Sequence, residues 1–343
     1  MDLKYLFKEA RYYRHLDGGL WRIGVKYLFA KTPLRKIVNT CFYNFFYSKI
    51  VKLKIKRQKP YILHLENTNI CNAKCIMCPH IKMKRKKEIM SQKDFEKIIE
   101  NIAPYAPIKY VTITGFGEPL ADKNIIEKIK YLNEKYPNYK ISIYTNASLL
   151  TKELTEKLLR LKILKINFSI NGTKKSYKRI MDLDYDSTVA NIDYFLKRKK
   201  ELGKKFPLTN VSAMLIKDNK NDMEDFKKYW MKKVDSVMIY LPSDWAGAVD
   251  VGVVDKVPFR FKRWPCSVLW KWVSIDVNGD LLMCCRDYES KIVFGNLKEQ
   301  NLSEVLGSKK WKDLLKNQAR YNFNTPICNK CDNCFDSSLD WWN

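Results

Sequence analysis

The sequence lacks any apolar stretch long enough to cross a bilayer. No run among its 343 residues approaches the roughly 18 apolar residues that a membrane-spanning helix needs. It also lacks the pattern of a secretory signal peptide. The ten cysteines are not spread out as in a disulfide-rich secreted protein, since all except Cys41 and Cys266 fall in tight groups. We therefore expect a cytoplasmic protein whose cysteines bind metal in a reducing compartment.

Acidic residues are scarce relative to basic ones. The chain has 37 Asp and Glu against 64 Lys and Arg, which gives a formal net charge of +27. Such an excess favours polyanionic neighbours, namely nucleic acid, an anionic membrane or a phosphorylated substrate. Most of the excess is lysine, so a solvated lysine surface explains it equally well. We do not expect nucleic acid to be the partner, and the substrate stays unidentified although an anionic one would suit the charge.

Residues 1–58 form a basic extension rich in aromatic side chains. The first sixty residues carry fifteen Lys and Arg but only three Asp and Glu. Apolar residues recur with helical spacing over residues 20–30 and 34–51, whereas residues 49–57 alternate with the period of a strand or extended linker. A basic amphipathic helix with aromatic residues can lie in a membrane interface, which predicts peripheral membrane association. The alternative, which we favour, is that this extension packs on the catalytic domain as a cap.

Between residues 59 and 245, short apolar strands alternate with helices. The predicted strands are residues 61–66, 110–114, 140–144, 165–169, 210–215 and 236–241. The predicted helices are residues 92–102, 123–135, 152–161, 188–202 and 223–234, with Ser91, Asp122, Thr151, Ser187 and Asn221 as their N-caps. Repeated β-α units imply a parallel sheet covered by helices, and six units are too few for a complete eight-stranded barrel.

A loop directly after the first predicted strand carries three cysteines. Cys71, Cys75 and Cys78 have the spacing C-x3-C-x2-C. Three thiolates leave a tetrahedral zinc ion one ligand short, but they suit a cubane 4Fe–4S cluster with one iron free for another ligand. The alternative is a zinc site in which His64 or His80 supplies the fourth ligand.

At these residues the sequence resembles the radical S-adenosylmethionine (radical SAM) enzymes. In that family the same loop follows the first strand of a partial barrel, and the methionine part of SAM chelates the free iron. The family usually has an aromatic residue just before the third cysteine, where this chain has Met77. The resemblance implies a partial (β/α)6 TIM-like barrel that binds a 4Fe–4S cluster and SAM.

Polar residues follow the next predicted strands at the ends where parallel α/β folds place their functional groups. The second strand ends in the motif G-x-G-E-P, in which Gly115 and Gly117 let the backbone approach a ligand and Glu118 can accept from an ammonium group. This motif resembles the glycine-rich segment with which radical SAM enzymes hold the amino group of SAM. The resemblance further implies that Asn146 and Ser169, after the third and fourth strands, bind the ribose and carboxylate; each is equally compatible with a turn.

The remaining cysteine groups lie in residues 260–343. Asn278-Gly279 between two apolar runs predicts a hairpin that brings Cys266 and Cys284 toward each other. The chain then has a C-x2-C-x2-C group, whose members are Cys328, Cys331 and Cys334. A hairpin pair and two further thiolates could close a site around either zinc or a 4Fe–4S cluster.

This cysteine-rich region resembles the SPASM and Twitch domains that carry auxiliary clusters in radical SAM enzymes. Gly279 stands between Cys266 and Cys284 as in their pattern, but the cysteines that follow are too few for two clusters. The resemblance therefore implies one auxiliary 4Fe–4S cluster, held by Cys266, Cys284 and two of the last three cysteines, with Cys328 and Cys331 preferred over Cys334. In related sulfatase maturases an acidic base follows the second ligand. Here Cys285 and then Asp287 follow it, and both are candidate catalytic residues.

These resemblances imply an enzyme that cleaves SAM reductively and uses the resulting 5′-deoxyadenosyl radical to abstract hydrogen from an unactivated carbon. An external one-electron donor such as flavodoxin or ferredoxin would start the reaction. We expect a net oxidation, because the auxiliary cluster offers an electron sink. The alternatives are a redox-neutral epimerase with Cys285 as hydrogen donor, a peptide-, lipid- or glycan-modifying enzyme of the same superfamily, and a non-enzymatic zinc or electron-transfer protein.

Overall fold

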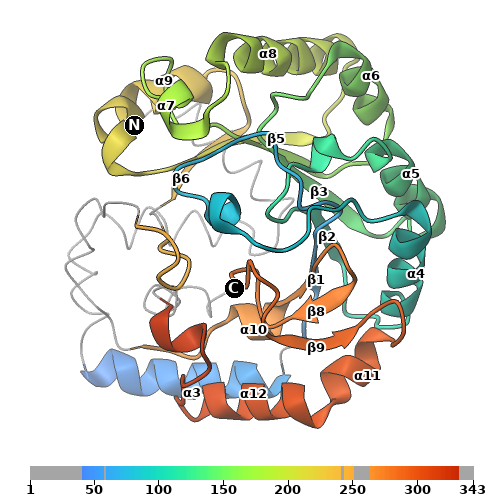
Figure 1. Cartoon of the computed structure of the whole chain (residues 1–343), viewed down its shortest axis with the longest axis vertical. Helices are drawn as coiled ribbons and strands as arrows, with labels where there is room; N and C mark the ends of the chain where they lie inside the picture. Colours follow the sequence, from blue (N-terminus) through green and yellow to red (C-terminus); the bar gives the residue numbers. More distant parts are fainter. Residues whose placement is uncertain (1–40, 58, 241–242, 251–262, 332–343) are drawn as a thin grey trace.

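The computed structural model describes residues 41–57, 59–240, 243–250 and 263–331 (Figure 1). Within these residues the strands form one sheet in the order β6-β5-β4-β3-β2-β1-β7-β8-β9. Their bounds are β1 Ile62–Leu65, β2 Tyr110–Ile113, β3 Lys140–Thr145, β4 Lys165–Ser169, β5 Leu208–Met214, β6 Ser236–Tyr240, β7 Trp272–Ile275, β8 Asp280–Leu282 and β9 Val293–Asn296. Strands β1 to β6 are parallel neighbours, which confirms the predicted α/β core.

Helices connect the parallel strands and cover the convex side of the sheet. They are α4 Gln92–Ile102, α5 Ile125–Lys135, α6 Lys152–Arg160, α7 Tyr177–Met181, α8 Tyr185–Glu201 and α9 Met223–Met231. Figure 1 shows α4, α5, α6 and α8 in an arc outside the strands, as in a partial barrel. The side chains of Ser91 and Thr151 cap α4 and α6 as predicted, whereas α5, α8 and α9 begin after Asn124, Asp184 and Asp222.

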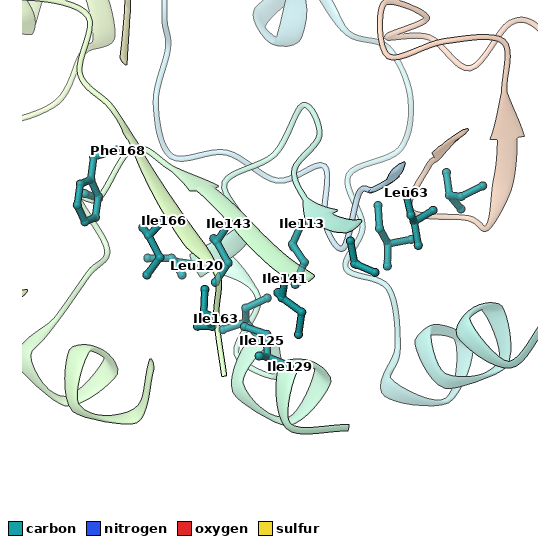
Figure 2. Close-up of a cluster of buried hydrophobic side chains, with 14 of the residues drawn as sticks. Leu63, Ile113, Leu120, Ile125, Ile129, Ile141, Ile143, Ile163, Ile166 and Phe168 are labelled. Atoms are coloured by element: carbon teal, nitrogen blue, oxygen red, sulfur yellow. The ribbon is translucent and has the colours of Figure 1, made fainter. Parts of the chain in front are cut away.

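The apolar core lies between the sheet and these helices. In Figure 2, Ile113, Ile141 and Ile143 from the strands lie near Ile125 and Ile129 of α5. All five side chains are almost completely buried. Burying each such side chain contributes about 1.5–3 kcal/mol, so this layer fixes the strand ends on which the candidate site is built.

The prediction of a strand or extended linker over residues 49–57 is wrong. These residues belong to helix α3, Cys41–Arg57. Val51 and Ile55 are four residues apart and therefore share one helix face, which packs on the core, while Leu53 is 58% exposed. Lysines and apolar residues therefore alternate in this sequence although the segment is a helix, because the apolar residues four positions apart still share one face. The rest of the predicted extension, residues 1–40, lies outside the described residues, and no described helix is long and apolar enough to span a bilayer.

The C-terminal region continues the sheet of the barrel. Strand β7 pairs in parallel with β1, and β7, β8 and β9 form the antiparallel continuation. The predicted hairpin at Asn278-Gly279 is present, and Gly279 has a φ of 86°, a value that favours glycine. The remaining helices, α10 Val268–Lys271, α11 Leu302–Gly307 and α12 Lys309–Ala319, follow this hairpin or lead into it. The strand that carries the first cysteine loop therefore has the C-terminal hairpin as its direct neighbour.

Candidate active site

The first cysteine loop is held in place by backbone hydrogen bonds. The amides of Lys74 and Ile76 donate to the last turn of α7, at the carbonyl oxygens of Met181 and Ile180, each at 3.0 Å. From the segment after β6, the Trp245 indole Nε1 donates to the carbonyl oxygen of Met77 at 3.0 Å. The Met77 side chain is buried in the core. The position where the family usually has an aromatic residue therefore keeps its apolar, inward-facing role here.

The three thiols of this loop are close enough to influence one another. Burial raises the pKa of Cys71 to about 11, and burial together with the neighbouring Cys71 and Cys78 raises the pKa of Cys75. All three are free cysteines. Thiols with raised pKa values resist ionisation, whereas a bound metal centre stabilises their thiolates. The donor set therefore fits a 4Fe–4S cluster with Cys71, Cys75 and Cys78 as its protein ligands.

The two histidines considered as zinc ligands are engaged elsewhere. The ring of His64 stacks on Trp272 with centroids 4.4 Å apart, and burial, followed by the charge of Lys165, lowers its pKa to about 4. The Nε2 atom of His80 lies 2.9 Å from both the Asn69 carbonyl oxygen and the Lys87 Nζ atom. Neither arrangement supports a Cys3His zinc site.

Close packing within the protein requires the two glycines of the G-x-G-E-P motif. A Cβ atom on Gly117 would lie 2.2 Å from the carbonyl oxygen of Thr68, and one on Gly115 would lie 2.4 Å from the Glu66 side chain. Both contacts are with the segment that leads from β1 into the cysteine loop. The glycines thus bring the second strand end against the first, a packing reason that the sequence analysis did not foresee.

Glu118 presents a buried carboxylate without a cationic partner among the described residues. Its oxygens accept hydrogen bonds from the Thr145 hydroxyl at 2.6 Å, the Asn146 amide at 2.7 Å and the Leu120 amide at 3.0 Å. Burial raises the pKa of Glu118 to about 7, although these three hydrogen bonds lower it. A buried carboxylate of this kind is suited to pair with the ammonium group of a ligand.

Asn146 links the third strand end to the cysteine loop. Its Nδ2 atom donates to the Asn72 side chain at 3.0 Å, and Asn72 in turn donates to the Ser148 hydroxyl at 2.8 Å. The fourth predicted residue, Ser169, accepts from Asn167 at 3.2 Å at the end of β4. The glycine motif, Asn146 and the cysteine loop therefore form one connected group, while Ser169 lies on the neighbouring strand.

A buried ion network behind this group was missed by the sequence analysis. Arg85 pairs with Glu66 and lies 3.5 Å from Asp276 of the C-terminal region. The Glu66 carboxylate also accepts from the amides of Phe116, in the glycine motif, and Val277, in the hairpin. Arg85 lies in the dense basic run over residues 82–87, whose composition alone does not distinguish a structural arginine from solvated lysines.

The second cysteine group gathers in the C-terminal region. Burial and the neighbouring thiols of Cys285, Cys328 and Cys331 raise the pKa of Cys284. The side chain of Gln318, which is 0% exposed, accepts from the Cys266 amide and donates to the Cys328 sulfur, both at 3.3 Å. Gln318 thus links Cys266 to Cys328, and Cys284 lies near Cys328 and Cys331, so these four cysteines gather in one region and their donor set fits an auxiliary 4Fe–4S cluster.

Asp287, a candidate catalytic residue, holds the turn that follows it. Both carboxylate oxygens accept backbone amides of the following turn, from Lys291 at 2.9 Å and Ile292 at 2.8 Å. Cys285 is a half-buried free thiol beside Cys284. Cys334 lies outside the described residues. Among the described residues, no three His, Cys, Asp or Glu side chains are placed to hold a single metal ion.

Comparison with known families matches two separate segments of the chain. The model of the radical SAM superfamily matches residues 65–229, and that of the SPASM iron–sulfur cluster-binding domain matches residues 266–334. The chain belongs to the radical SAM superfamily. As a radical SAM enzyme with a C-terminal SPASM domain it uses a 4Fe–4S cluster, SAM and auxiliary iron–sulfur chemistry, which confirms the cofactors inferred from the sequence.

Curated radical SAM relatives carry different activities. The enzyme is 23% identical to the S-adenosyl-L-methionine-dependent 2-deoxy-scyllo-inosamine dehydrogenase of Niallia circulans, over 79% of this chain and 92% of that one. It is also 23% identical to the tungsten-containing aldehyde ferredoxin oxidoreductase cofactor-modifying protein of Pyrococcus furiosus, over 52% of this chain and 50% of that one. The alignment thus spans only half of the second relative's length.

Solved structures of radical SAM enzymes share the fold. BtrN in complex with AdoMet and 2-DOIA has a TM-score of 0.55 at 20% identity and covers 80% of this chain and 94% of its own. SuiB of Streptococcus suis bound to the precursor peptide SuiA has a TM-score of 0.64 at 16% identity and covers 95% and 87%. These similarities support the partial barrel with an appended cysteine-rich domain.

Proposed function

We propose that this radical SAM enzyme catalyses the two-electron oxidation of an unactivated carbon in its substrate. The observation that carries the proposal is the gathering of four cysteines in the C-terminal region, where Gln318 links Cys266 to Cys328 and Cys284 lies near Cys328 and Cys331. The dehydrogenase relative, aligned over 92% of its length, supports the same class of reaction.

The site residues divide between two clusters and SAM. In this proposal Cys71, Cys75 and Cys78 hold the first cluster, and Cys266, Cys284, Cys328 and Cys331 hold the auxiliary one. When bound, the first cluster and SAM supply a 5′-deoxyadenosyl radical that removes a hydrogen atom from the substrate, and the auxiliary cluster supplies an acceptor for the second electron. A hydroxyl group or carbon adjacent to the oxidised substrate carbon then loses a proton to solvent, so a double bond forms between the two atoms and the substrate has lost two hydrogens in total.

The chain's own residues bind and orient SAM. Glu118 pairs with its ammonium group through a carboxylate already fixed by Thr145 and Asn146. Asn146 and Ser169 provide hydrogen-bonding groups for the ribose and carboxylate. Phe116 and Trp245 pack edge to face at 5.5 Å, and Trp245 also donates to the cysteine loop, so together they shield that loop from water.

Cys285 favours one second candidate, a redox-neutral epimerisation. It is a free thiol adjacent in sequence to a proposed cluster ligand, and no ligand role is assigned to it. A thiol can return a hydrogen atom to a substrate radical from the opposite face. Such a reaction would place one solvent deuterium in the product, whereas the oxidation would place none.

The proposal is tested with anaerobically reconstituted enzyme. With dithionite and SAM, the wild-type enzyme should form 5′-deoxyadenosine, and the variant with Ala at Cys71, Cys75 and Cys78 should form none. A matched variant, Cys285→Ala, should retain this cleavage, and it should also still form product if the reaction is an oxidation. Continued 5′-deoxyadenosine formation by the triple variant would contradict the assignment of the first cluster, and deuterium in the product would favour the epimerase.

Radical SAM enzymes receive their electrons from external donors. We propose that an acidic carrier such as flavodoxin or ferredoxin serves this enzyme, because the net charge of +27 attracts acidic proteins. Because these electron carriers are cytoplasmic proteins, the same proposal includes a cytoplasmic location for the enzyme.

A further inference from the structure

One face of the barrel sheet is polar across five strands. Side chains that are register partners in parallel neighbours point to the same face. The first row of partners, taken across β7, β1, β2, β3 and β4, consists of Ser274, His64, Thr112, Ser142 and Lys165. A second row, two residues further along β3 and β4, continues through β5 and β6 and consists of Tyr144, Asn167, Asn210 and Ser236. Barrel interiors are usually filled by bulky apolar side chains, so two polar layers are unusual.

This polar face is the concave interior of the barrel. The apolar residues of the opposite face pack against the helices that Figure 1 shows outside the strands. Strands β1 and β4 are separated by two others, which would place them about 14 Å apart in a flat sheet. The charge of Lys165 on β4 nevertheless contributes to the lowered pKa of His64 on β1. The arc of helices in Figure 1 shows that the sheet curves around this face, and the effect of Lys165 on His64 agrees with that curvature.

Lys165 is a buried cation without a carboxylate partner among the described residues. The residue is 9% exposed, and its Nζ atom donates to the Tyr144 hydroxyl at 2.8 Å and lies 4.7 Å from the centre of the Tyr144 ring. Lys128 shows the usual arrangement, because this fully buried lysine pairs with Asp122 at 2.6 Å. A buried ammonium group is costly unless an anion and hydrogen-bond acceptors surround it. An anionic group from outside the chain would complete the environment of Lys165.

Three other polar groups on the same face lack partners. The side-chain oxygens of Asn210, Ser236 and Ser274 are buried and have no hydrogen-bond partner within the described residues. Asn210 and Ser236 are direct register partners in the second row, and Ser274 ends the first row. Hydroxyl groups of a ligand could satisfy all three, whereas a hydrocarbon chain could satisfy none.

We propose that the barrel interior binds an anionic, hydroxylated small molecule, with Lys165 and Tyr144 as the anchor for its carboxylate or phosphate. This inference rests on the proposed function and names the substrate class of the same site. Lys165 begins β4, four residues or about 13 Å before Ser169, while its ammonium group reaches up to Tyr144 near the end of β3. A molecule anchored there can extend its other end toward the strand ends, where the cysteine loop lies.

Calorimetry of the anaerobically reconstituted holoenzyme tests the proposal with three probes: inorganic phosphate, acetate and ribose 5-phosphate. Acetate and inorganic phosphate distinguish a carboxylate from a phosphate site, and ribose 5-phosphate adds hydroxyls. We expect ribose 5-phosphate to bind most tightly and the Lys165→Met variant to bind each anion at least tenfold more weakly. The control Lys162→Met removes an exposed lysine three residues away and should bind like the wild type. Lys165→Arg retains the charge and should bind within a few-fold of the wild type.

Each other outcome is decisive. Equal anion affinity in the wild-type and Lys165→Met enzymes would overturn the anchor, as would equal losses in Lys165→Met and Lys162→Met, which indicate surface binding. Equal affinities for inorganic phosphate and ribose 5-phosphate would overturn the hydroxyl-binding part. Because calorimetry does not depend on SAM cleavage, a failure of the anion site is distinguishable from a failure of the proposed function, which 5′-deoxyadenosine formation tests separately.

Discussion

The guanidinium group of Arg85 donates two hydrogen bonds to the carboxylate of Glu66, at 2.9 and 3.1 Å. Arg85 also donates to the carbonyl oxygen of Tyr288 at 2.7 Å. The pair therefore joins the end of β1, the segment after the cysteine loop and the SPASM domain. Both side chains are more than nine-tenths buried, so this pair is screened little by solvent.

Breaking the pair should destabilise the enzyme. Arg85→Met leaves the Glu66 carboxylate buried without its cation, and we expect the free energy of unfolding to fall by about 3 kcal/mol. Lys86→Met is the control, because Lys86 is exposed and its ion pair with Glu88 should contribute less than about 1 kcal/mol. Urea unfolding of the reconstituted enzyme measures both. Equal stability of the two variants would show that the pair does not hold the domains together.

SAM binding should weaken below neutral pH. The pKa of Glu118 lies near 7 in the free enzyme because of burial, so the carboxylate must lose a proton before it pairs with the SAM ammonium. We expect affinity for SAM to be constant above about pH 7 and to fall by up to about tenfold per unit below it. Calorimetry between about pH 5.5 and 8.5 measures this slope. In Glu118→Gln the affinity should be lower and its slope absent; an unchanged slope would assign the titration to another group.

Gln318 should tune the auxiliary cluster. Its amide donates to the sulfur of Cys328, and hydrogen bonds to cluster sulfurs raise reduction potentials. In Gln318→Leu we expect a potential lower by on the order of 50 mV, the equivalent of one hydrogen bond of about 1 kcal/mol. The exposed neighbour Asn317 offers the control Asn317→Leu. A redox titration followed by electron paramagnetic resonance gives the values, and equal potentials in both variants would rule out this tuning.

The basic extension should bind anionic lipid if the membrane interpretation holds. Leu53, Lys54, Arg57 and Lys59 border one recess on the surface of α3. Full-length enzyme should then float with phosphatidylserine vesicles at low salt and be released at high salt. The double change Lys54→Glu and Arg57→Glu should reduce binding by more than tenfold, whereas Lys123→Glu with Lys130→Glu, on and before α5, should not. Absence of flotation would support the packed cap.

Local patterns predicted much of the barrel. Strand β4 and helix α4 have the predicted bounds, because apolar periodicity and the Ser91 cap act within a few residues. The parallel pairing of β7 with β1 joins segments about two hundred residues apart and left no local signal.

The site was predictable only in part. The cysteine spacings and the G-x-G-E-P motif indicated the cofactors, since each motif lies within one loop. Other features depend on strand register and long-range packing. These are the Arg85–Glu66 pair, the turn whose amides bind Asp287, and the polar rows of the barrel. Those features could be found only in three dimensions.

Iron content tests the central claim, that the enzyme carries one cluster in the barrel and one auxiliary cluster. The wild-type enzyme should contain about eight irons and the variant with Ala at Cys71, Cys75 and Cys78 about four, with an iron–sulfur absorption band in both. Loss of the first ligands should leave the auxiliary group intact, because its four proposed ligands all lie in the C-terminal region, with Cys266 and Cys328 linked by Gln318 and Cys284 near Cys328 and Cys331. One zinc and no iron in the triple variant would contradict the account and remove the electron acceptor on which the proposed oxidation depends.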